Sequence, residues 1–303
     1  MVADTIAPTA PPVACAWCGR AFGEGSDGLP GRLRCRGCGV ATTDPWPSDA
    51  DLARAYAGWY RPQSGRFSGV GDRLLRRTRA RLAVHLDQRA PPGPVLDVGA
   101  GDGALLDALR ARGRDATGLE RRSSRPDVRE STVQETDGVW SAVVFWHSLE
   151  HLREPGEALR AASRLLAPGG ILVVAVPNAE SLQAAVFGGR WFALDFPRHL
   201  VHIPASALRA SLKELGLEVE RESPLRGGQV VFGWLYGLVG LLPGHPDLYD
   251  AIRRPEARRT TLSGPRRAAA LGAAAVMWPL AVAAGSIEAL LGRGGTVYIE
   301  ARA

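Results

Sequence analysis

Val95-Leu96-Asp97-Val98-Gly99-Ala100-Gly101-Asp102-Gly103 joins a short apolar run to a glycine-rich turn. The residues that follow, 104–112, carry leucines at helical spacing, so the glycines lie between a strand and a helix. Glycines in such a turn let the backbone approach a bound nucleoside, and the helix N-terminus presents unpaired amides to the ligand. This stretch therefore predicts the nucleotide-binding turn of an α/β domain.

Short apolar strands continue to alternate with amphipathic helical stretches beyond this turn. That alternation predicts a parallel sheet covered by helices on both faces. We expect a Rossmann-like, doubly wound sheet of seven strands. After the first strand at 95–98, the predicted strands are 116–119, 128–133, 141–146, 171–176, 217–220 and 296–301.

Acidic residues follow the first two strands and indicate the kind of cofactor. Asp97 lies two residues before the first glycine, where a carboxylate disfavours a pyrophosphate but can hold an ammonium group. Glu120 ends the second strand, where it can accept hydrogen bonds from a ribose diol. Gly99, Gly101 and Ala104 also satisfy a relaxed dehydrogenase fingerprint, so a nicotinamide enzyme stays open as an alternative.

The four cysteines form two CxxC pairs near the N-terminus. Residues 1–13 are Pro-rich and lack the basic and apolar regions of a secretory signal, so we expect a cytoplasmic protein. In a reducing compartment this spacing favours a metal over disulfides. Four thiolates leave no open coordination position, which predicts a structural zinc ribbon. Its ligands are Cys15, Cys18, Cys35 and Cys38.

Further motifs follow the glycine turn in a fixed order: Leu149-Glu150-His151, Leu166-Ala167-Pro168-Gly169-Gly170 and Val176-Pro177-Asn178. Together with the glycine turn, they resemble the ordered signatures of class I S-adenosylmethionine-dependent methyltransferases. The resemblance covers residues 93–220 and the last strand. It implies a last strand that inserts antiparallel beside the sixth.

The same resemblance assigns a cofactor site. It implies that the glycine turn and its preceding acid hold the methionine part of S-adenosylmethionine, and that the acid after the second strand holds the ribose. The residues concerned are Asp97, Gly99, Ala100, Gly101, Gly103 and Glu120, with Arg121, Trp146 and His147 as neighbours in the site.

The cysteine segment and the residues at 44–48 and 52–60 resemble the entry segment of zinc-ribbon methyltransferases. Some of those enzymes act on nucleotide-linked sugars. We expect this chain to differ from the sugar enzymes in lacking their long C-terminal domain. We therefore expect a small-molecule methyl acceptor, with sugar-linked and lipid-linked acceptors both open.

The acceptor atom, oxygen, nitrogen or carbon, stays open, and three histidines are candidates for a catalytic base, because a hydroxyl, ammonium or carbon-acid acceptor must lose a proton on methyl transfer. His147 and His151 follow the fourth strand at the edge where ligands bind. His199 lies in an aromatic and charged segment, 191–200, without helix or strand pattern, which we interpret as a lid. We select His199 and His151. The structural alternative is that Asp195 and Arg198 form an ion pair and the histidines cap local backbone.

The net charge of +6 does not by itself indicate a nucleic-acid partner. Many basic residues fall in one helical stretch, which could guide an anionic ligand but which we interpret as a solvated helix face. We expect no nucleic acid to bind, and we expect His85 in that stretch to be a surface or packing residue. The arginines are Arg73, Arg76, Arg77, Arg79 and Arg81.

Two uncharged stretches, 230–242 and 268–287, interrupt the sheet before its last strand. The second has a length that suits a membrane span, but nine of its twenty residues are alanine and Pro279 interrupts it. The chain must return to the sheet, so we predict a helical pair that packs as a lid, forms a homodimer surface, or makes peripheral membrane contact.

The domain division follows from these patterns. We predict a zinc ribbon at 1–45, a linker with N-terminal helices at 46–92, a core at 93–228, a helical insertion at 229–292 and the last strand at 293–303. The linker includes a short helix at 50–57. A noncatalytic protein that binds the cofactor as a sensor or scaffold is the third interpretation.

Overall fold

The computed structural model describes residues 13–22, 26–57, 67, 71–123, 125–226, 230–258 and 263–303. The Pro-rich N-terminus up to residue 12 and most of 58–70 lie outside the described residues. The expectations for those stretches, including the end of the 52–60 segment, are therefore not addressed by the structure.

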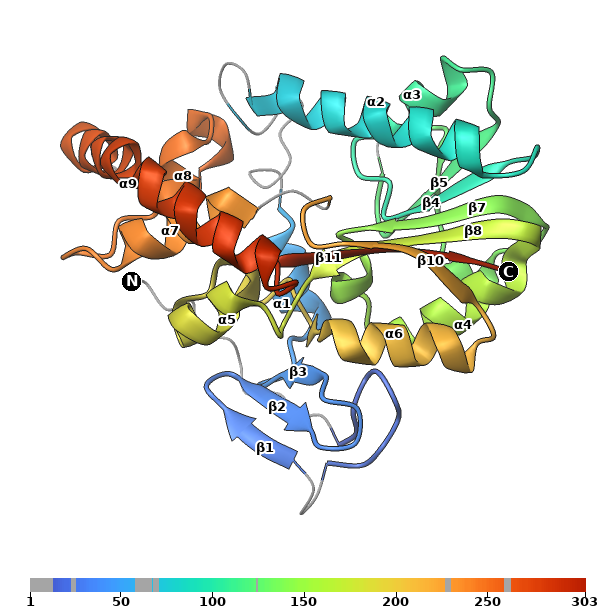
Figure 1. The fold of residues 1–303 in the computed structure, drawn as a ribbon, viewed down its shortest axis with the longest axis horizontal. Coiled ribbons are helices and arrows are strands. Elements are labelled where there is room, and N and C mark those ends of the chain that lie inside the picture. The colour runs from blue at the N-terminus through green and yellow to red at the C-terminus, as the bar shows by residue number, and fades with distance from the viewer. Residues whose placement is uncertain are drawn as a thin grey trace.

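A seven-stranded sheet forms the centre of the molecule (Figure 1). Five neighbouring strands are parallel, and the last strand of the chain inserts antiparallel between the fifth and sixth. The predicted fold class is thus confirmed. In spatial order the strands are β10 (Glu218–Ser223), β11 (Thr296–Arg302), β8 (Leu166–Pro177), β7 (Trp140–Trp146), β4 (Val95–Val98), β5 (Ala116–Glu120) and β6 (Val128–Glu130).

Helices cover both faces of this sheet, because alternate residues of its central strands face opposite sides. In β7, Ala142 and Val144 belong to the apolar cluster beneath α2 (Gly71–Arg89) and α3 (Ala104–Arg110). Val143 and Phe145 belong to the cluster beneath α4 (Pro155–Leu165) and α6 (Ala205–Glu214). Figure 1 shows these two helix layers above and below the sheet.

Strand limits differ from the prediction where side chains compete for backbone groups. The third strand ends at Glu130, because Thr132 and Glu135 form a capping box that starts a 3-10 turn, Val133–Glu135. The fifth strand begins earlier than predicted, since Leu166 already pairs with Trp140.

The described residues of the ribbon region form three strands, and the core supplies a fourth to their sheet. The strands β1 (Ser26–Leu29), β2 (Arg32–Cys35) and β3 (Ala41–Thr43) form an antiparallel sheet with β9 (Val201–His202). We expected neither a strand at 201–202 nor its pairing with the ribbon. The Trp17 indole also donates a hydrogen bond to Ser211 Oγ on α6, over 3.0 Å. The ribbon is therefore joined to the core both by strand pairing and by a side-chain hydrogen bond.

Short helical segments connect these layers. α1 (Asp49–Ala55) follows the ribbon, and Ser48 caps its first turn together with Asp51. α5 (Leu182–Phe187) follows β8 and begins at the Ser181 cap. The 3-10 turns near the sheet edge are Leu149–His151, Gly188–Arg190 and Phe192–Leu194. The lid segment, expected to lack helical pattern, thus contains helical turns.

The described residues of the insertion, 230–258 and 263–292, form three helices rather than a pair: α7 (Val230–Gly240), α8 (Leu248–Ile252) and α9 (Gly264–Leu290), with a 3-10 turn at Pro255–Ala257. Glu288 of α9 is fully buried, and it accepts hydrogen bonds from the side chains of Gln183 and Trp234 at 2.8 and 2.9 Å. This buried carboxylate fixes α9 against α5 and α7.

The arginine-rich helix α2 is not wholly a solvated face. Arg73, Arg76, Arg77 and Arg81 are exposed, but the Arg79 guanidinium lies 4.8 Å from the centroid of the Trp146 ring. His85 is more than a surface residue, because its Nε2 hydrogen-bonds Glu300 Oε1, a buried carboxylate, over 2.5 Å. Burial lowers the pKa of His85.

Candidate active site

The glycine turn follows β4 with a backbone that other residues rarely adopt. Gly99, Gly101 and Gly103 have φ values of +83°, +62° and +74°. A Cβ at Gly99 would lie 2.4 Å from Ser148 Cβ, so a side chain there would displace the segment after β7. The turn is therefore held open by glycine and packed closely against the start of the Leu149–His151 turn.

Glu120 meets this turn from the neighbouring strand. Its Oε2 accepts a hydrogen bond from the Gly101 amide at 3.0 Å, and its Oε1 accepts one from the Arg121 amide at 3.1 Å. Parallel pairing of β4 with β5 brings both carboxyl ends to one edge. The structure thus brings together Asp97, the glycines and Glu120, as the sequence predicts.

Asp97 is buried at this edge and its charge is unfavourable without a ligand. Burial raises the pKa of Asp97 to about 7. Arg79 lowers this pKa, whereas Glu120 and Asp102 raise it. A cation bound between these acids would stabilise the carboxylate. The donor set therefore fits the ammonium group of an amino-acid cofactor.

Arg79 also lies at this site, although the sequence favoured a solvated face for its helix. It reaches the site from α2 and lies over Trp146, near Asp97. A signal was present, because Arg79 precedes the buried Leu82, Ala83 and Leu86 by three, four and seven residues. That spacing places it on the inward stripe of the helix. Asp97 and Arg79 together match the two charges of an amino-acid zwitterion.

Trp146 and His147 end β7 beside this pair. The Trp146 ring lies edge-on to the His147 and Tyr298 rings, with centroids 6.2 and 6.0 Å away. His147 has a φ of +53°, and its amide donates to the Ala175 carbonyl at 2.8 Å. The Arg121 guanidinium lies 5.6 Å from the centroid of the Tyr56 ring, whose hydroxyl is hydrogen-bonded to His151 Nδ1 at 3.0 Å.

Glu150 is the centre of a second cluster, just past β7. It is fully buried, and among the described residues neither of its carboxylate oxygens meets a donor with hydrogen-bond geometry. His147 Nδ1 lies 3.5 Å and His199 Nε2 lies 4.0 Å from Glu150 Oε1. Burial raises the pKa of Glu150, but the three surrounding histidines bring it below its ordinary value. The Glu150 carboxylate is therefore favoured in its anionic form, and a proton donor or a cation beside it would stabilise its charge.

His199 and His151 lie together at this carboxylate. Their ring centroids are 4.6 Å apart and the planes meet at 73°. His199 Nδ1 donates to the Ala193 carbonyl at 2.8 Å, which leaves Nε2 as the acceptor nitrogen. His151 Nδ1 donates to the Arg198 carbonyl at 2.8 Å, and burial lowers its pKa to about 4. Both predicted catalytic residues are therefore in one cluster.

Asp195 and Arg198 form the ion pair of the structural alternative. Burial raises the pKa of Asp195, but Arg198 and His199 bring it down to about 2. The histidines do cap backbone carbonyls, yet Asp195 Oδ2 also lies 3.7 Å from His199 Nε2. Two carboxylates consequently face the imidazole nitrogen that can accept a proton.

Aromatic side chains of the insertion join the segment that carries His199. The Phe192 ring lies 5.1 Å from Phe232, 4.9 Å from Tyr236 and 5.5 Å from Tyr249, centroid to centroid. These rings are partly exposed. They form an apolar wall that a planar or apolar acceptor can contact.

Two groups of side chains can hold a metal ion. The four cysteines bring their sulfurs together, with Cys15–Cys38 and Cys18–Cys35 Sγ separations of 3.6 and 3.7 Å. Tetrahedral zinc with Zn–S bonds of about 2.3 Å places its sulfurs roughly 3.8 Å apart, so the four thiols fit. Glu150, His151 and His199 also offer ligand atoms within 4.8 Å of one another.

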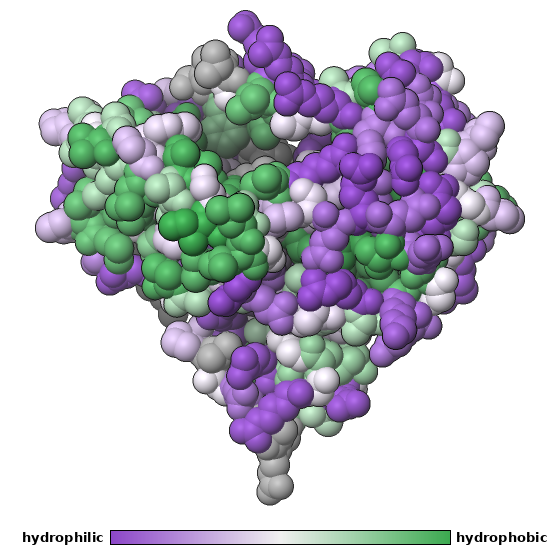
Figure 2. Space-filling view, viewed as in Figure 1, coloured by the Kyte–Doolittle hydropathy of each residue, from purple (hydrophilic) through white to green (hydrophobic). Residues whose placement is uncertain are grey.

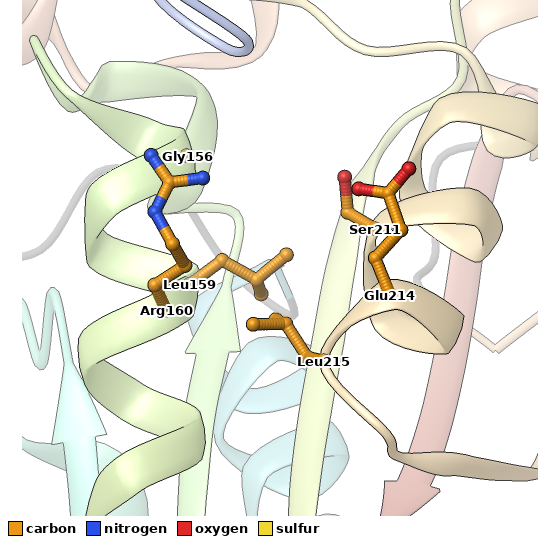
Figure 3. A pocket seen from close by; sticks show the side chains of 6 residues that line it. All are labelled: Gly156, Leu159, Arg160, Ser211, Glu214 and Leu215. Carbon is orange, nitrogen blue, oxygen red and sulfur yellow. The ribbon is translucent and has the colours of Figure 1, made fainter.

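Two cavities on the surface of the described residues lie away from this chemistry. One of about 180 Å³ lies between α4 and α6 (Figure 3), where Leu159 and Leu215 face each other below Arg160 and Glu214. Another, of about 370 Å³, lies between the ribbon and α4 and includes Trp46 and Arg153. Neither is lined by the glycine turn or by Glu150.

Comparison with known proteins agrees with this geometry. Residues 67–222 match the family described as methyltransferase domain. The match covers just over half of the 303 residues, and the chain belongs to this methyltransferase family. The predicted family is confirmed, which favours it over the nicotinamide alternative.

The individual relatives share 30% sequence identity or less with this chain. Ubiquinone biosynthesis O-methyltransferases from Pseudomonas aeruginosa and Xanthomonas oryzae are 29% and 30% identical over 150 residues, or 42% of this chain. The matched stretch spans 65% and 63% of those relatives' length. A solved SAM-dependent methyltransferase from Archaeoglobus fulgidus is 19% identical, with a TM-score of 0.42 over 75% of this chain and 94% of that one.

Proposed function

We propose that the protein transfers a methyl group from S-adenosylmethionine to a hydroxyl oxygen of a small-molecule acceptor. The observation that carries this proposal is the position of buried Asp97 at the glycine turn, with Glu120 bonded across the turn and Arg79 near enough to lower the pKa of Asp97. The curated relatives are O-methyltransferases, which supports oxygen as the acceptor atom.

Each residue of the turn has a role in binding the cofactor. Asp97 would hold the ammonium group, Arg79 the carboxylate and Glu120 the ribose diol. Ala100 and the glycines leave room for the backbone to approach the nucleoside, while Trp146 and His147 border it. When bound, the cofactor supplies a methyl group on a sulfonium, which an acceptor can attack in line.

His199 acts as the base in this proposal. The acceptor hydroxyl gives its proton to His199 Nε2, because Nδ1 is already bonded to the Ala193 carbonyl. With its proton on His199, the acceptor oxygen could take the methyl group, and the carbon–sulfur electron pair would stay with the cofactor's sulfur. Glu150 and Asp195 stabilise the resulting imidazolium. His151 stays neutral and packs against the base.

The proposal is tested by incubating the protein with methyl-tritiated S-adenosylmethionine and a set of catechol and phenol acceptors. We expect labelled methyl ether, and we expect His199→Ala to lower turnover about a hundredfold while calorimetry shows unchanged cofactor affinity. The exposed His245 provides the matched control, His245→Ala. Cofactor binding without turnover on any acceptor would favour the sensor or scaffold interpretation.

The ribbon is proposed to carry structural zinc on Cys15, Cys18, Cys35 and Cys38. It would fix the ribbon against the core and take no part in the chemistry, because four thiolates complete its coordination. Metal analysis of the purified protein should find one zinc per chain, and Cys35→Ser should release it. The domain limits, the cytoplasmic location and a homodimer through the insertion stay predictions.

A further inference from the structure

The long helix α9 has an unusual distribution of side chains. Its buried face carries small residues, namely Ala270, Ala274, Ala281 and Gly285. Large apolar side chains point outward instead: Val276 is 80% exposed, and Leu290 is 87% exposed. The other exposed members are Leu271, Trp278, Leu280, Val282 and Ile287, and the exposed Leu291 directly follows the helix. Large apolar residues normally occupy the buried face, so something is expected to cover this one.

The outward face of α9 carries no charge between Ala268 and Leu291. The one acidic residue in that interval, Glu288, is fully buried and bonded to Gln183 and Trp234. In the most apolar window of α9, 22% of the residues are buried, whereas the core helix of a soluble domain is mostly buried. Figure 2 shows the result as a broad apolar patch over the insertion.

The topology decides how such a helix can meet a membrane. The insertion leaves the sheet after β10 and returns at β11, and these strands are neighbours. A single crossing would leave the two ends on opposite sides. The return path would need α7, but its 11 residues span about 17 Å, and a bilayer core is about 30 Å thick. The helix α9 therefore has to lie along the surface.

Charges at the two ends of α9 identify the kind of surface. Arg266 is exposed at the beginning of the helix, and Arg293 is exposed three residues after its last one. Arginine at the margin of an apolar face can extend toward phosphate groups while its stem stays on the apolar side. Trp278 lies between them on the exposed face, and tryptophan is enriched at membrane interfaces.

We infer that the outer face of α9 binds an anionic lipid bilayer, with the helix parallel to the membrane and its arginines on lipid phosphates. This inference needs no methyl transfer and goes beyond the proposed function. It selects one of the three roles expected for the insertion.

The test is sedimentation of the full chain with vesicles. Vesicles of equal parts phosphatidylcholine and phosphatidylglycerol should pellet the protein, and phosphatidylcholine alone should pellet much less. The double variant Val276→Glu, Leu280→Glu should weaken binding about tenfold or more. Arg266→Ala should weaken it about fivefold, and added salt should have the same direction of effect.

Matched control variants distinguish loss of the α9 surface from general effects of adding a negative charge or removing an arginine. Val139→Glu adds a charge at an apolar residue that is 65% exposed before β7, and Arg164→Ala removes an exposed arginine on α4. Both should pellet like the unchanged protein, and circular dichroism should show equal helix content in all variants. Vesicle binding is measured without cofactor or acceptor, so its outcome is independent of turnover.

Two outcomes would overturn the inference. One is equal pelleting of the double variant and the unchanged protein, or no pelleting with anionic vesicles. The other is a dimer in light scattering that the double variant converts to a monomer while neither binds vesicles, since a second copy would then cover the face.

Discussion

The Thr43 hydroxyl donates a hydrogen bond of 2.7 Å to the backbone carbonyl of His199. The Thr43 amide donates to the next carbonyl, that of Leu200, at 2.9 Å. Leu200 in turn donates from its amide to the Glu150 carbonyl at 2.8 Å. The third strand of the ribbon is therefore bonded directly to the segment that carries the proposed base and, through it, to the buried carboxylate.

Thr43→Val should lower kcat more than it changes cofactor affinity. The substitution leaves the buried His199 carbonyl without its hydroxyl donor, at a cost of about 1–3 kcal/mol in unfolding free energy. The base segment then has a weaker support, so its alignment with the acceptor suffers. Steady-state kinetics and calorimetry measure the two effects. Thr43→Ser keeps the hydroxyl and should restore kcat; equal rates for the valine variant and the unchanged protein would remove this positioning role.

Cofactor affinity should rise as the pH increases through about 7, where Asp97 ionises. The bound ammonium group requires the carboxylate, so affinity at pH 6 should be about tenfold lower than at pH 8. Calorimetry across this range measures the effect, and Asp97→Asn should bind weakly at every pH. A flat profile in the unchanged protein would contradict the assigned contact.

The free energy of unfolding should also depend on the ionisation of Asp97, but it should fall with rising pH where cofactor affinity rises. The pKa of Asp97 is raised in the folded state to about 7 from an unfolded value of about 3.9. The folded state therefore retains a proton that the unfolded chain has lost. The contribution of Asp97 to stability is present below about pH 4 and is lost as the pH rises to about 7. Asp97→Asn should remove this part of the pH dependence in urea titrations without cofactor.

Arg79→Met should weaken cofactor binding about tenfold, because a charge-assisted contact to the cofactor carboxylate is lost. Methionine retains an apolar stem over Trp146, so packing changes little. The control is Arg76→Met, an exposed arginine one turn earlier on the same helix. Titration with S-adenosylmethionine and with decarboxylated S-adenosylmethionine gives the sharper comparison. If Arg79 holds the carboxylate, the variant should lose affinity for the first ligand and not for the second.

Phe232→Ala should raise the KM for the acceptor while the cofactor Kd stays the same. Phe232 packs against Phe192, in the segment that leads to His199, and it does not belong to the glycine turn. Initial rates at saturating cofactor measure the effect, which we expect to be about tenfold for an aromatic acceptor. Phe232→Tyr should retain the ring contact and behave like the unchanged protein. A change in cofactor Kd would instead indicate a general disturbance.

The sheet and the donor side of the site could be predicted because they follow local rules. A buried strand, its glycine turn and the next helix are consecutive in sequence, and acids at strand ends fall at one edge of a parallel sheet. Asp97 and Glu120 were found in this way. The limits of some strands differ from the prediction by a few residues. An example is the third strand, which ends early because Thr132 caps a 3-10 turn.

Other features depend on partners far away in the sequence. Residues 201–202 are too short for a periodic pattern, so their pairing with Ala41 and Thr42 has no local signal. His85 lies on a helix of low apolar content, and its burial depends on Glu300 in the last strand. Arg79 lies among exposed arginines, so the sequence favoured a solvated position for it as well. The strand at 201–202 and the contact of His85 depend on long-range contacts that local sequence patterns do not predict, whereas the position of Arg79 had a local signal in its helical spacing.

The shared sheet of β1, β2, β3 and β9 has a consequence for engineering chimeras. A ribbon transplanted from another enzyme as one contiguous N-terminal piece would arrive without the strand that completes its sheet, since that strand is encoded about 160 residues later. Both pieces would have to be exchanged as a set, and the second piece includes the neighbours of His199. A chimera that exchanges the ribbon would therefore also change residues next to His199, the proposed base.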